Sequence, residues 1–173
     1  MRTAAKRKSK KRPVYDTIKL RGMLEYVLRD AVTGEIVRRG KKGNTVTYSG
    51  RNWSMTRILN TTVTANMLSA LAFGSVSTTP QPTDTQLGGF MFISNFANNT
   101  TFIPGSANGP SQFSGAMSFV QSQASLFPNP IGELGIYNGS ATNSATLFNH
   151  WNTSPPIPFT STNTFSVTVT LLS

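Results

Sequence analysis

The sequence predicts a mainly β protein, an antiparallel β-sandwich or jelly-roll with one short helix, preceded by a disordered or extended basic arm. Three observations lead to this fold class. Apolar and polar residues alternate over residues 18–28 and again over residues 165–171. Between these segments lie several short apolar runs, separated by stretches rich in Gly, Pro, Asn and Ser. About eight short strands joined by frequent turns are typical of two-sheet β proteins.

The first 13 residues form a basic segment that we expect to be an arm. It contains seven of the 16 Lys and Arg residues of the chain, namely Arg2, Lys6, Arg7, Lys8, Lys10, Lys11 and Arg12. A segment of high charge and low hydrophobicity cannot offset the entropy that it would lose on ordering. We therefore expect residues 1–13 to be mobile and residues 14–173 to form a single β-sandwich domain.

Residues 18–28 are predicted to form the first strand. Their even-numbered positions are mostly apolar and their odd-numbered positions mostly charged, which is the pattern of a strand with one buried face. Residues 30–34 have turn chemistry, and residues 35–39 are expected to return as the second strand of a hairpin. Residues 40–43, Gly-Lys-Lys-Gly, are predicted to form a basic turn before a short β-prone run at 44–48.

One short helix is predicted after this run. Residues 52–59 place Trp53, Met55, Ile58 and Leu59 on one helical face, with Ser49 or Asn52 as a possible N-cap. The Thr-rich residues 61–64 are expected to end the helix, because β-branched Thr is a poor helix former. Residues 65–72 fit either a helix or a strand. Residues 74–89, with two prolines and a Gly pair, are predicted to form a loop.

The remaining strands are predicted from short apolar or alternating runs. They are expected at residues 90–96, as a buried strand, and at residues 113–121, 132–137, 146–151 and 165–171. A loop is expected at 97–110 and a turn at 138–144. Residues 154–158 contain three prolines and are expected to be stiff and extended.

Charge is unevenly distributed along the chain. All 16 basic residues lie at or before Arg57, together with four acidic residues, and only Asp84 and Glu133 carry a charge after it. A region rich in Thr, Ser, Asn and Gly with so few charges suits β-structure that packs against other proteins. We interpret this as a sign of assembly. The alternative is a Thr/Asn-rich β domain that is soluble despite its low charge.

Several classes of protein are excluded by what the sequence lacks. Without Cys there are no disulfides, thiolate metal sites or thiol nucleophiles. The basic N-terminal residues are not followed by the apolar stretch of a secretory signal. No apolar run of about 18 residues is present either, so we expect a soluble chain that does not span a membrane.

Few ionisable groups are available for catalysis. In the region after Arg57 the only carboxylic acids or imidazole are those of Asp84, Glu133 and His150. We interpret the lone His150 as a packed or surface residue, because zinc would need three or four ligands. Asp84 is expected to serve a local turn or cap. Glu133 is interpreted as the outward residue of a half-exposed strand, with a buried carboxylate paired to an arginine as the alternative. We therefore expect no enzymatic activity, cofactor or metal.

The basic arm is the strongest chemical signal in the sequence. Lys and Arg neutralise phosphates and release condensed counterions, which favours nucleic-acid binding. Between Met1 and Pro13 there is no aromatic residue to stack on bases, so the binding is expected to be non-specific. Because basic residues continue beyond the arm, we extend the candidate nucleic-acid-binding set to Lys41, Lys42 and Arg51. The alternatives are a solubilising tail, a nuclear import signal, or contact with an acidic protein.

The order of short motifs resembles that of small β-sandwich structural proteins of tailed bacteriophages, which occur in heads, necks and tails. In that group a hairpin leads to an Asn…Gly-Arg-Asn turn and a short helix, matched here by residues 44–59. An Asp-Thr-x-Leu-Gly loop motif is matched by residues 84–88, and Glu-x-Gly-hydrophobic-aromatic-Asn by residues 133–138. Pro-Ile-Pro-Phe-Thr at 156–160 and a final Thr-rich strand complete the likeness, which covers about residues 18–173.

This resemblance implies a component of a virion. The basic arm departs from it and is similar instead to the arms of single jelly-roll capsid proteins of small icosahedral viruses, which face the packaged genome. The sequence therefore predicts a non-enzymatic virion structural protein. Its expected partners are copies of itself, other virion proteins and nucleic acid, with no membrane and no small-molecule substrate. The alternative is a cellular β-domain that binds nucleic acid without sequence specificity.

Overall fold

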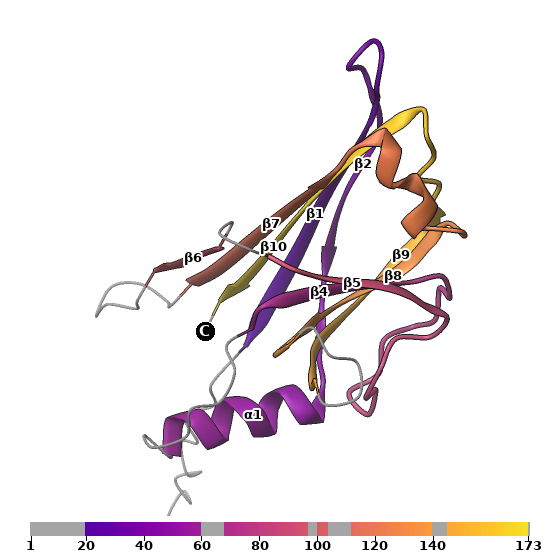
Figure 1. The fold of residues 1–173 in the computed structure, drawn as a ribbon. Helices are drawn as coiled ribbons and strands as arrows, with labels where there is room; N and C mark the ends of the chain where they lie inside the picture. Colours follow the sequence, from indigo (N-terminus) through magenta and orange to yellow (C-terminus); the bar gives the residue numbers. More distant parts are fainter. Residues whose placement is uncertain (1–19, 60–67, 97–99, 104–111, 140–144, 173) are drawn as a thin grey trace, which may run out of the picture.

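The computed structural model of the protein describes residues 20–59, 68–96, 100–103, 112–139 and 145–172. In these residues the chain forms ten strands, one α-helix and one 3-10 helix (Figure 1). The strands are β1 (Arg21–Asp30), β2 (Ile36–Gly43), β3 (Thr45–Val46), β4 (Ala70–Gly74), β5 (Phe90–Asn95), β6 (Thr100–Ile103), β7 (Gln112–Phe119), β8 (Ile131–Tyr137), β9 (Leu147–Ile157) and β10 (Asn163–Leu172). The helices are α1 (Tyr48–Leu59) and η1 (Gln121–Leu126). The predicted arm and the Thr-rich residues 61–64 lie outside the described residues.

Two five-stranded antiparallel sheets face each other, which confirms the predicted β-sandwich. The first sheet has the order β2-β1-β10-β7-β6, and the second has the order β3-β9-β8-β4-β5. β1 pairs with β10 along its whole length, from Arg21 opposite Leu172 to Asp30 opposite Asn163. The two most clearly alternating segments of the sequence are therefore neighbours in the first sheet. Helix α1 lies across one end of the sandwich (Figure 1).

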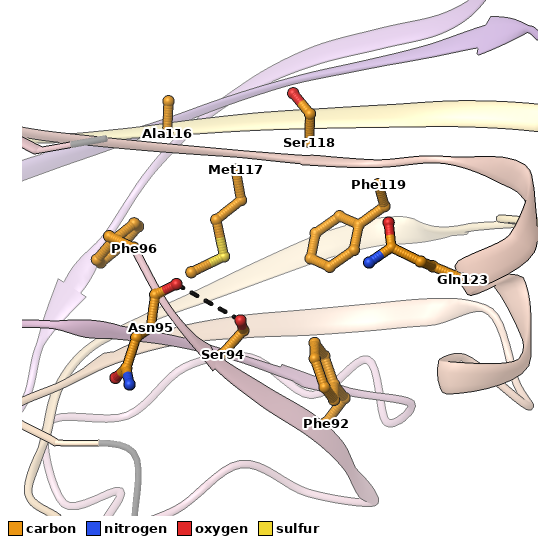
Figure 2. Close-up of a pocket in the computed structure, with 9 residues that line it drawn as sticks. All are labelled: Phe92, Ser94, Asn95, Phe96, Ala116, Met117, Ser118, Phe119 and Gln123. Carbon is orange, nitrogen blue, oxygen red and sulfur yellow. Dashed lines mark hydrogen bonds between the residues drawn. The ribbon is translucent and has the colours of Figure 1, made fainter. Parts of the chain in front are cut away.

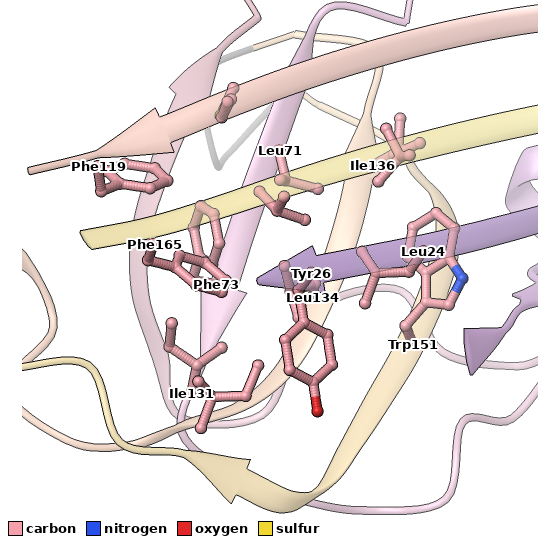
Figure 3. Packing of buried hydrophobic residues seen from close by; sticks show 14 of the residues in the cluster. Leu24, Tyr26, Leu71, Phe73, Phe119, Ile131, Leu134, Ile136, Trp151 and Phe165 are labelled. Atoms are coloured by element: carbon pink, nitrogen blue, oxygen red, sulfur yellow. The ribbon is translucent and has the colours of Figure 1, made fainter. Parts of the chain in front are cut away.

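The main hydrophobic core fills the space between the two sheets (Figure 3). From β1 it receives Leu24, Tyr26 and Leu28, as the alternation predicts. Phe73 of β4 packs edge-to-face on Phe119, with ring centroids 5.3 Å apart. Each such side chain stabilises the fold by roughly 1.5–3 kcal/mol through burial. The two strands of alternating sequence, β1 and β10, thus supply much of the surface on which the second sheet packs.

The loop formed by residues 75–89 covers the outer face of the second sheet. Leu87 of this loop is buried in a second, smaller cluster with Tyr137 of β8 and Leu147 of β9. Strand β8 is therefore buried on both faces along its entire length. This double cover explains why its sequence does not alternate, since a strand with two buried faces needs no polar side.

Three predictions, a turn, a loop and a buried strand, differ from the observed strands. Residues 40–43 belong to β2 instead of a turn, because the ladder with β1 continues until Gly43 lies opposite Met23. Strand β6 falls within the predicted loop 97–110. The predicted buried strand at 90–96 is the edge strand β5, in which Phe90 is 45% exposed.

The helix begins earlier than the sequence predicts. Its first residue is Tyr48, and the predicted caps Ser49 and Asn52 lie inside it. Thr47 acts as the cap, because its Oγ1 accepts a hydrogen bond from the Gly50 amide at 3.0 Å. The residue that caps the helix therefore belongs to the β-prone run before it.

Gly40 of β2 provides a test of how Tyr26 packs. A Cβ atom at Gly40 would lie 2.5 Å from carbon atoms of the Tyr26 ring, whereas a Cβ at Gly43 would meet no atom within 4 Å. We expect Gly40→Ala to lower the free energy of unfolding by about 1–3 kcal/mol, since the buried ring must move. Gly43→Ala, on the same strand, should change it by less than about 0.5 kcal/mol. Urea denaturation of both variants checks this, and equal effects would contradict the packing.

Candidate functional site

The predicted nucleic-acid-binding residues fall in three parts of the chain. The seven basic residues of the arm lie outside the described residues. Lys41 and Lys42 are neighbours on β2, which is an edge strand of the first sheet. Arg51 is exposed on the first turns of α1, with its guanidinium 5.8 Å from the ring centroid of Tyr48. The sheet register places Lys41 and Lys42 on opposite faces of the first sheet, because adjacent residues of a strand point to opposite sides.

Arg39 and Lys41 project from the outer face of the first sheet. They lie opposite Val27 and Glu25, which face away from the core. The Lys41 Nζ lies 2.6 Å from the Glu25 carboxylate, and both side chains are more than half exposed. Such an exposed pair contributes little to stability and leaves the lysine open to other anions. Arg39 and Lys41 also help to line an open hollow of about 500 Å³ on this face.

Two arginines of β1 share this outer face. Arg21 and Arg29 are exposed and alternate with the buried positions of the strand. The guanidinium of Arg29 donates a hydrogen bond to the Gly34 carbonyl at 3.0 Å, within the hairpin turn. We define the outer basic face as Arg21, Arg29, Arg39 and Lys41. The sequence prediction included only Lys41 of these four, because beyond the arm it selected Lys41, Lys42 and Arg51 and placed residues 40–43 in a turn.

Arg38 and Lys42 face the second sheet instead. They lie opposite Leu28 and Leu24, which are both fully buried in the core. Since directly opposite residues share a face of the sheet, both basic side chains point inward at the open edge of the sandwich. The guanidinium of Arg38 lies 5.8 Å from the ring centroid of Tyr26 and so covers that part of the core.

These two inward side chains connect the sheets by binding the backbone of β9. Arg38 donates to the carbonyls of Pro156 at 2.7 Å and Pro155 at 2.5 Å. The Lys42 ammonium donates to the Ser154 carbonyl at 3.2 Å. Strand β3 pairs with β9 only at Asn149 and His150, so the rest of that edge of β9 relies on other donors. Arg38 and Lys42 are therefore engaged within the chain, unlike the outer basic face.

The only Asp, Glu and His residues that follow Arg57 converge on one another. His150 of β9 lies between two carboxylates, with Nδ1 2.7 Å from Asp84 Oδ2 and Nε2 2.5 Å from Glu133 Oε2. The side chains of His150 and Glu133 are 2% and 0% exposed, and that of Asp84 is 26% exposed. Strands β8 and β9 position Glu133 and His150, and the 75–89 loop supplies Asp84. We call these three residues the His150 bridge.

The sequence interpretation of these residues was correct in part. His150 is packed, as expected, and Asp84 has its expected local role, accepting a hydrogen bond from the Gln81 amide at 2.7 Å. The preferred interpretation of Glu133 was wrong, because the residue is fully buried and its partner is a histidine. The 75–89 loop covers β8, and no local sequence pattern indicates such cover.

The proton on His150 compensates both carboxylates. Burial lowers the pKa of His150, but the hydrogen bonds to Glu133 and Asp84 outweigh it and raise the pKa above its ordinary value. The other oxygen of Glu133, Oε1, is buried without a hydrogen-bond partner among the described residues. Nearby, burial raises the pKa of Tyr137 to about 12, with a smaller contribution from the charge on Glu133. The bridge is therefore a buried ionic contact that fastens the 75–89 loop to the second sheet.

The His150 bridge is enclosed on most sides. Both ring nitrogens of His150 are occupied by carboxylates, and two of the three side chains are sealed from solvent. Within the described parts of the chain, no group of three His, Cys, Asp or Glu side chains is arranged to hold a metal ion. No helix in those parts is long and apolar enough to cross a membrane.

The His150 bridge predicts a specific pH dependence of stability. The folded state holds the imidazole proton more tightly than the unfolded chain, in which the pKa is about 6.5. The free energy of unfolding should therefore be highest below that pH and fall as pH rises through the raised folded-state pKa, by at most about 1.4 kcal/mol per pH unit. His150 is the only histidine of the chain, so His150→Gln should remove this slope. Chemical denaturation of both proteins from pH 6 to 9 measures how the free energy of unfolding depends on pH. The same slope in His150→Gln as in the wild type would contradict the bridge.

The inward and outward arginines of β2 should differ in their effect on stability. Arg38→Gln removes the donors to the Pro155 and Pro156 carbonyls and should cost about 1 kcal/mol. The neighbouring change Arg39→Gln removes a solvent-facing charge and should cost less than about 0.5 kcal/mol. Thermal denaturation of the two variants provides the comparison. A larger loss for Arg39→Gln would show that the faces of β2 are assigned the wrong way round.

Comparison of the chain with protein-family models, with curated proteins and with solved structures finds no match. Its function is therefore argued from its own residues and geometry.

Proposed function

We propose that this protein is a non-enzymatic structural component of a virus particle. In this proposal the β-sandwich assembles with other copies and other virion proteins, and the basic side of the molecule contacts packaged nucleic acid. The observation that carries the proposal is the separation of charge. Every Lys and Arg lies at or before Arg57, and the two later carboxylates are both directed at His150.

The neutral surface of β4 to β10 supports assembly. After Arg57 the sequence contains no acidic residue other than Asp84 and Glu133, and the His150 bridge engages both. Charged residues make up 13% of the chain, against about 25% in typical soluble domains. Depletion of charge marks the buried centres of protein interfaces, because desolvating a charge is costly. This surface suits contact with other uncharged protein surfaces.

The basic strands β1 and β2 support binding to a polyanion. The outer basic face presents four cations on β1 and β2, and Glu25 partly compensates them by pairing with Lys41. The arm adds seven more in sequence. Arginine and lysine side chains without interleaved aromatic residues favour contact with phosphates over the reading of bases. The resemblance of the motif order to phage β-sandwich proteins supports a virion as the setting, with non-specific binding to the genome.

The salt dependence of nucleic-acid binding tests this proposal. The slope of log K against log salt should be about −5 or steeper for the full chain on duplex DNA, and deletion of residues 1–13 should remove most of it. Replacing Arg39 and Lys41 by Gln in the full chain should make the slope less negative by about two. Replacing Arg38 and Lys42 by Gln is the matched control, because it removes the same charge from side chains that face inward. Fluorescence anisotropy over a salt series gives all four slopes.

The outcomes of this experiment separate the proposal from its alternatives. If the arm deletion and the Arg39/Lys41 variant bind duplex DNA as the full chain does, the basic side does not serve nucleic acid. Contact with an acidic protein surface would then be the better explanation of the basic residues. If binding behaves as expected but the protein stays monomeric at every concentration, a cellular nucleic-acid-binding domain explains the chain better than a virion component.

A further inference from the structure

The two long edge strands of the sandwich are protected very differently. An exposed sheet edge offers unpaired N–H and C=O groups to any other strand, and proteins usually block it with charges, proline or short length. Edge strand β2 carries Arg38, Arg39, Lys41 and Lys42. The other two edge strands are short, since β3 has two residues and β6 has four. Edge strand β5, Phe90–Asn95, reads Phe-Met-Phe-Ile-Ser-Asn and has neither a charge nor a proline.

Among the described residues, the surroundings of β5 extend this uncharged edge into an apolar surface. Phe90 is 45% exposed, and Val76 of the covering loop is 40% exposed. A Cβ atom at Gly89, the residue before β5, would lie 3.0 Å from Val76, so this exposed valine lies beside the start of the strand. Apolar residues that gather at an open edge indicate an interaction site more strongly than the same residues scattered singly.

A groove runs between β5 and the first sheet (Figure 2). It has a volume of about 170 Å³ and a mixed lining of apolar residues and polar ones, namely Phe92, Phe96, Ala116, Met117 and Phe119 with Ser94, Asn95, Ser118 and Gln123. In Figure 2 the side chains of Met117 and Phe119 project from β7 toward those of Phe92 and Phe96. The sandwich is thus not fully closed on this side, whereas Arg38 and Lys42 close the β2 side.

We infer that β5 is the self-association surface of this protein, at which the β5 strand of a second copy pairs antiparallel to extend the second sheet across two molecules. The inference rests on the proposed function for its setting, an assembly of many copies. A second copy is the occupant that the chemistry favours. Its β5 is equally uncharged and apolar, so pairing about a two-fold axis brings no like charges together. The basic arm does not fit, because an apolar edge offers its seven cations no partner.

The experiment compares two edges of the same full-length chain. Phe90→Lys with Asn95→Lys places charges at two positions of β5 that are exposed in the folded chain. Val37→Lys is the matched control, because Val37 is 56% exposed on the other long edge, β2. Sedimentation equilibrium in high salt, without nucleic acid, measures the dimer dissociation constant of each protein.

We expect the wild-type chain and Val37→Lys to dimerise with similar constants and the β5 variant to dimerise at least about 100-fold more weakly. A wild-type chain that remains monomeric, or a β5 variant that dimerises as the wild type does, would overturn the inference. If the β5 variant dimerises as the wild type does, self-association and DNA binding persist. The proposed function then survives, and only the assignment of β5 as the self-association surface is wrong. The first case, if DNA binding keeps its salt slope, points to the cellular alternative.

Hydrogen exchange on the wild-type chain provides a readout that does not depend on how well the variant folds. Backbone amides of Phe90–Asn95 should become more protected as the protein concentration rises through the dissociation constant. Amides of Ile36–Gly43, on the other edge, should not change. Protection that appears at β2 and not at β5 would overturn the inference even if the β5 variant were to unfold.

Discussion

The contact of His150 with Asp84 and Glu133 is the interaction on which the surface chemistry of this molecule depends. It places the only two carboxylates that follow Arg57 against one buried imidazole, so the residues of β4 to β10 present an almost uncharged surface. The same contact fastens the 75–89 loop over the second sheet, where Leu87 closes the smaller hydrophobic cluster. A buried ion pair is not necessarily a net source of stability. Here it determines which surfaces are left free of charge.

The basic part of the chain is divided by the register of a single hairpin. Arg39 and Lys41 face solvent beside Arg21 and Arg29, whereas Arg38 and Lys42 turn inward and bind carbonyls of β9. Half of the cations on β2 therefore hold the two sheets together, and the other half are available to a polyanion. Positive charge on β2 also protects that edge from pairing with another strand. In the proposed function, the eight residues of β2 thus combine a structural role, a binding role and protection of the sheet edge.

Much of the fold could be predicted from the sequence because two strands alternate clearly. Leu24, Tyr26 and Leu28 on β1 are buried as expected, and β10 pairs beside them. The errors arise where distant parts of the chain decide the outcome. Glu133 is buried because a loop about 50 residues earlier covers β8, and the direction of Lys42 depends on a ladder that continues past an apparent turn. One feature of the sequence pointed to the His150 bridge. Its members are the only Asp, Glu or His residues after Arg57.

We propose that assembly and nucleic-acid binding use separate sides of the molecule. Hydrogen exchange of the assembled full-length protein, measured with and without duplex DNA, tests this claim most directly. Added DNA is expected to protect the amides of residues 1–13, β1 and β2 from exchange. The protection of β4, β5 and β8 should stay as it is in the assembly without DNA. DNA-induced protection confined to β4, β5 and β8, with none at the basic side, would contradict it.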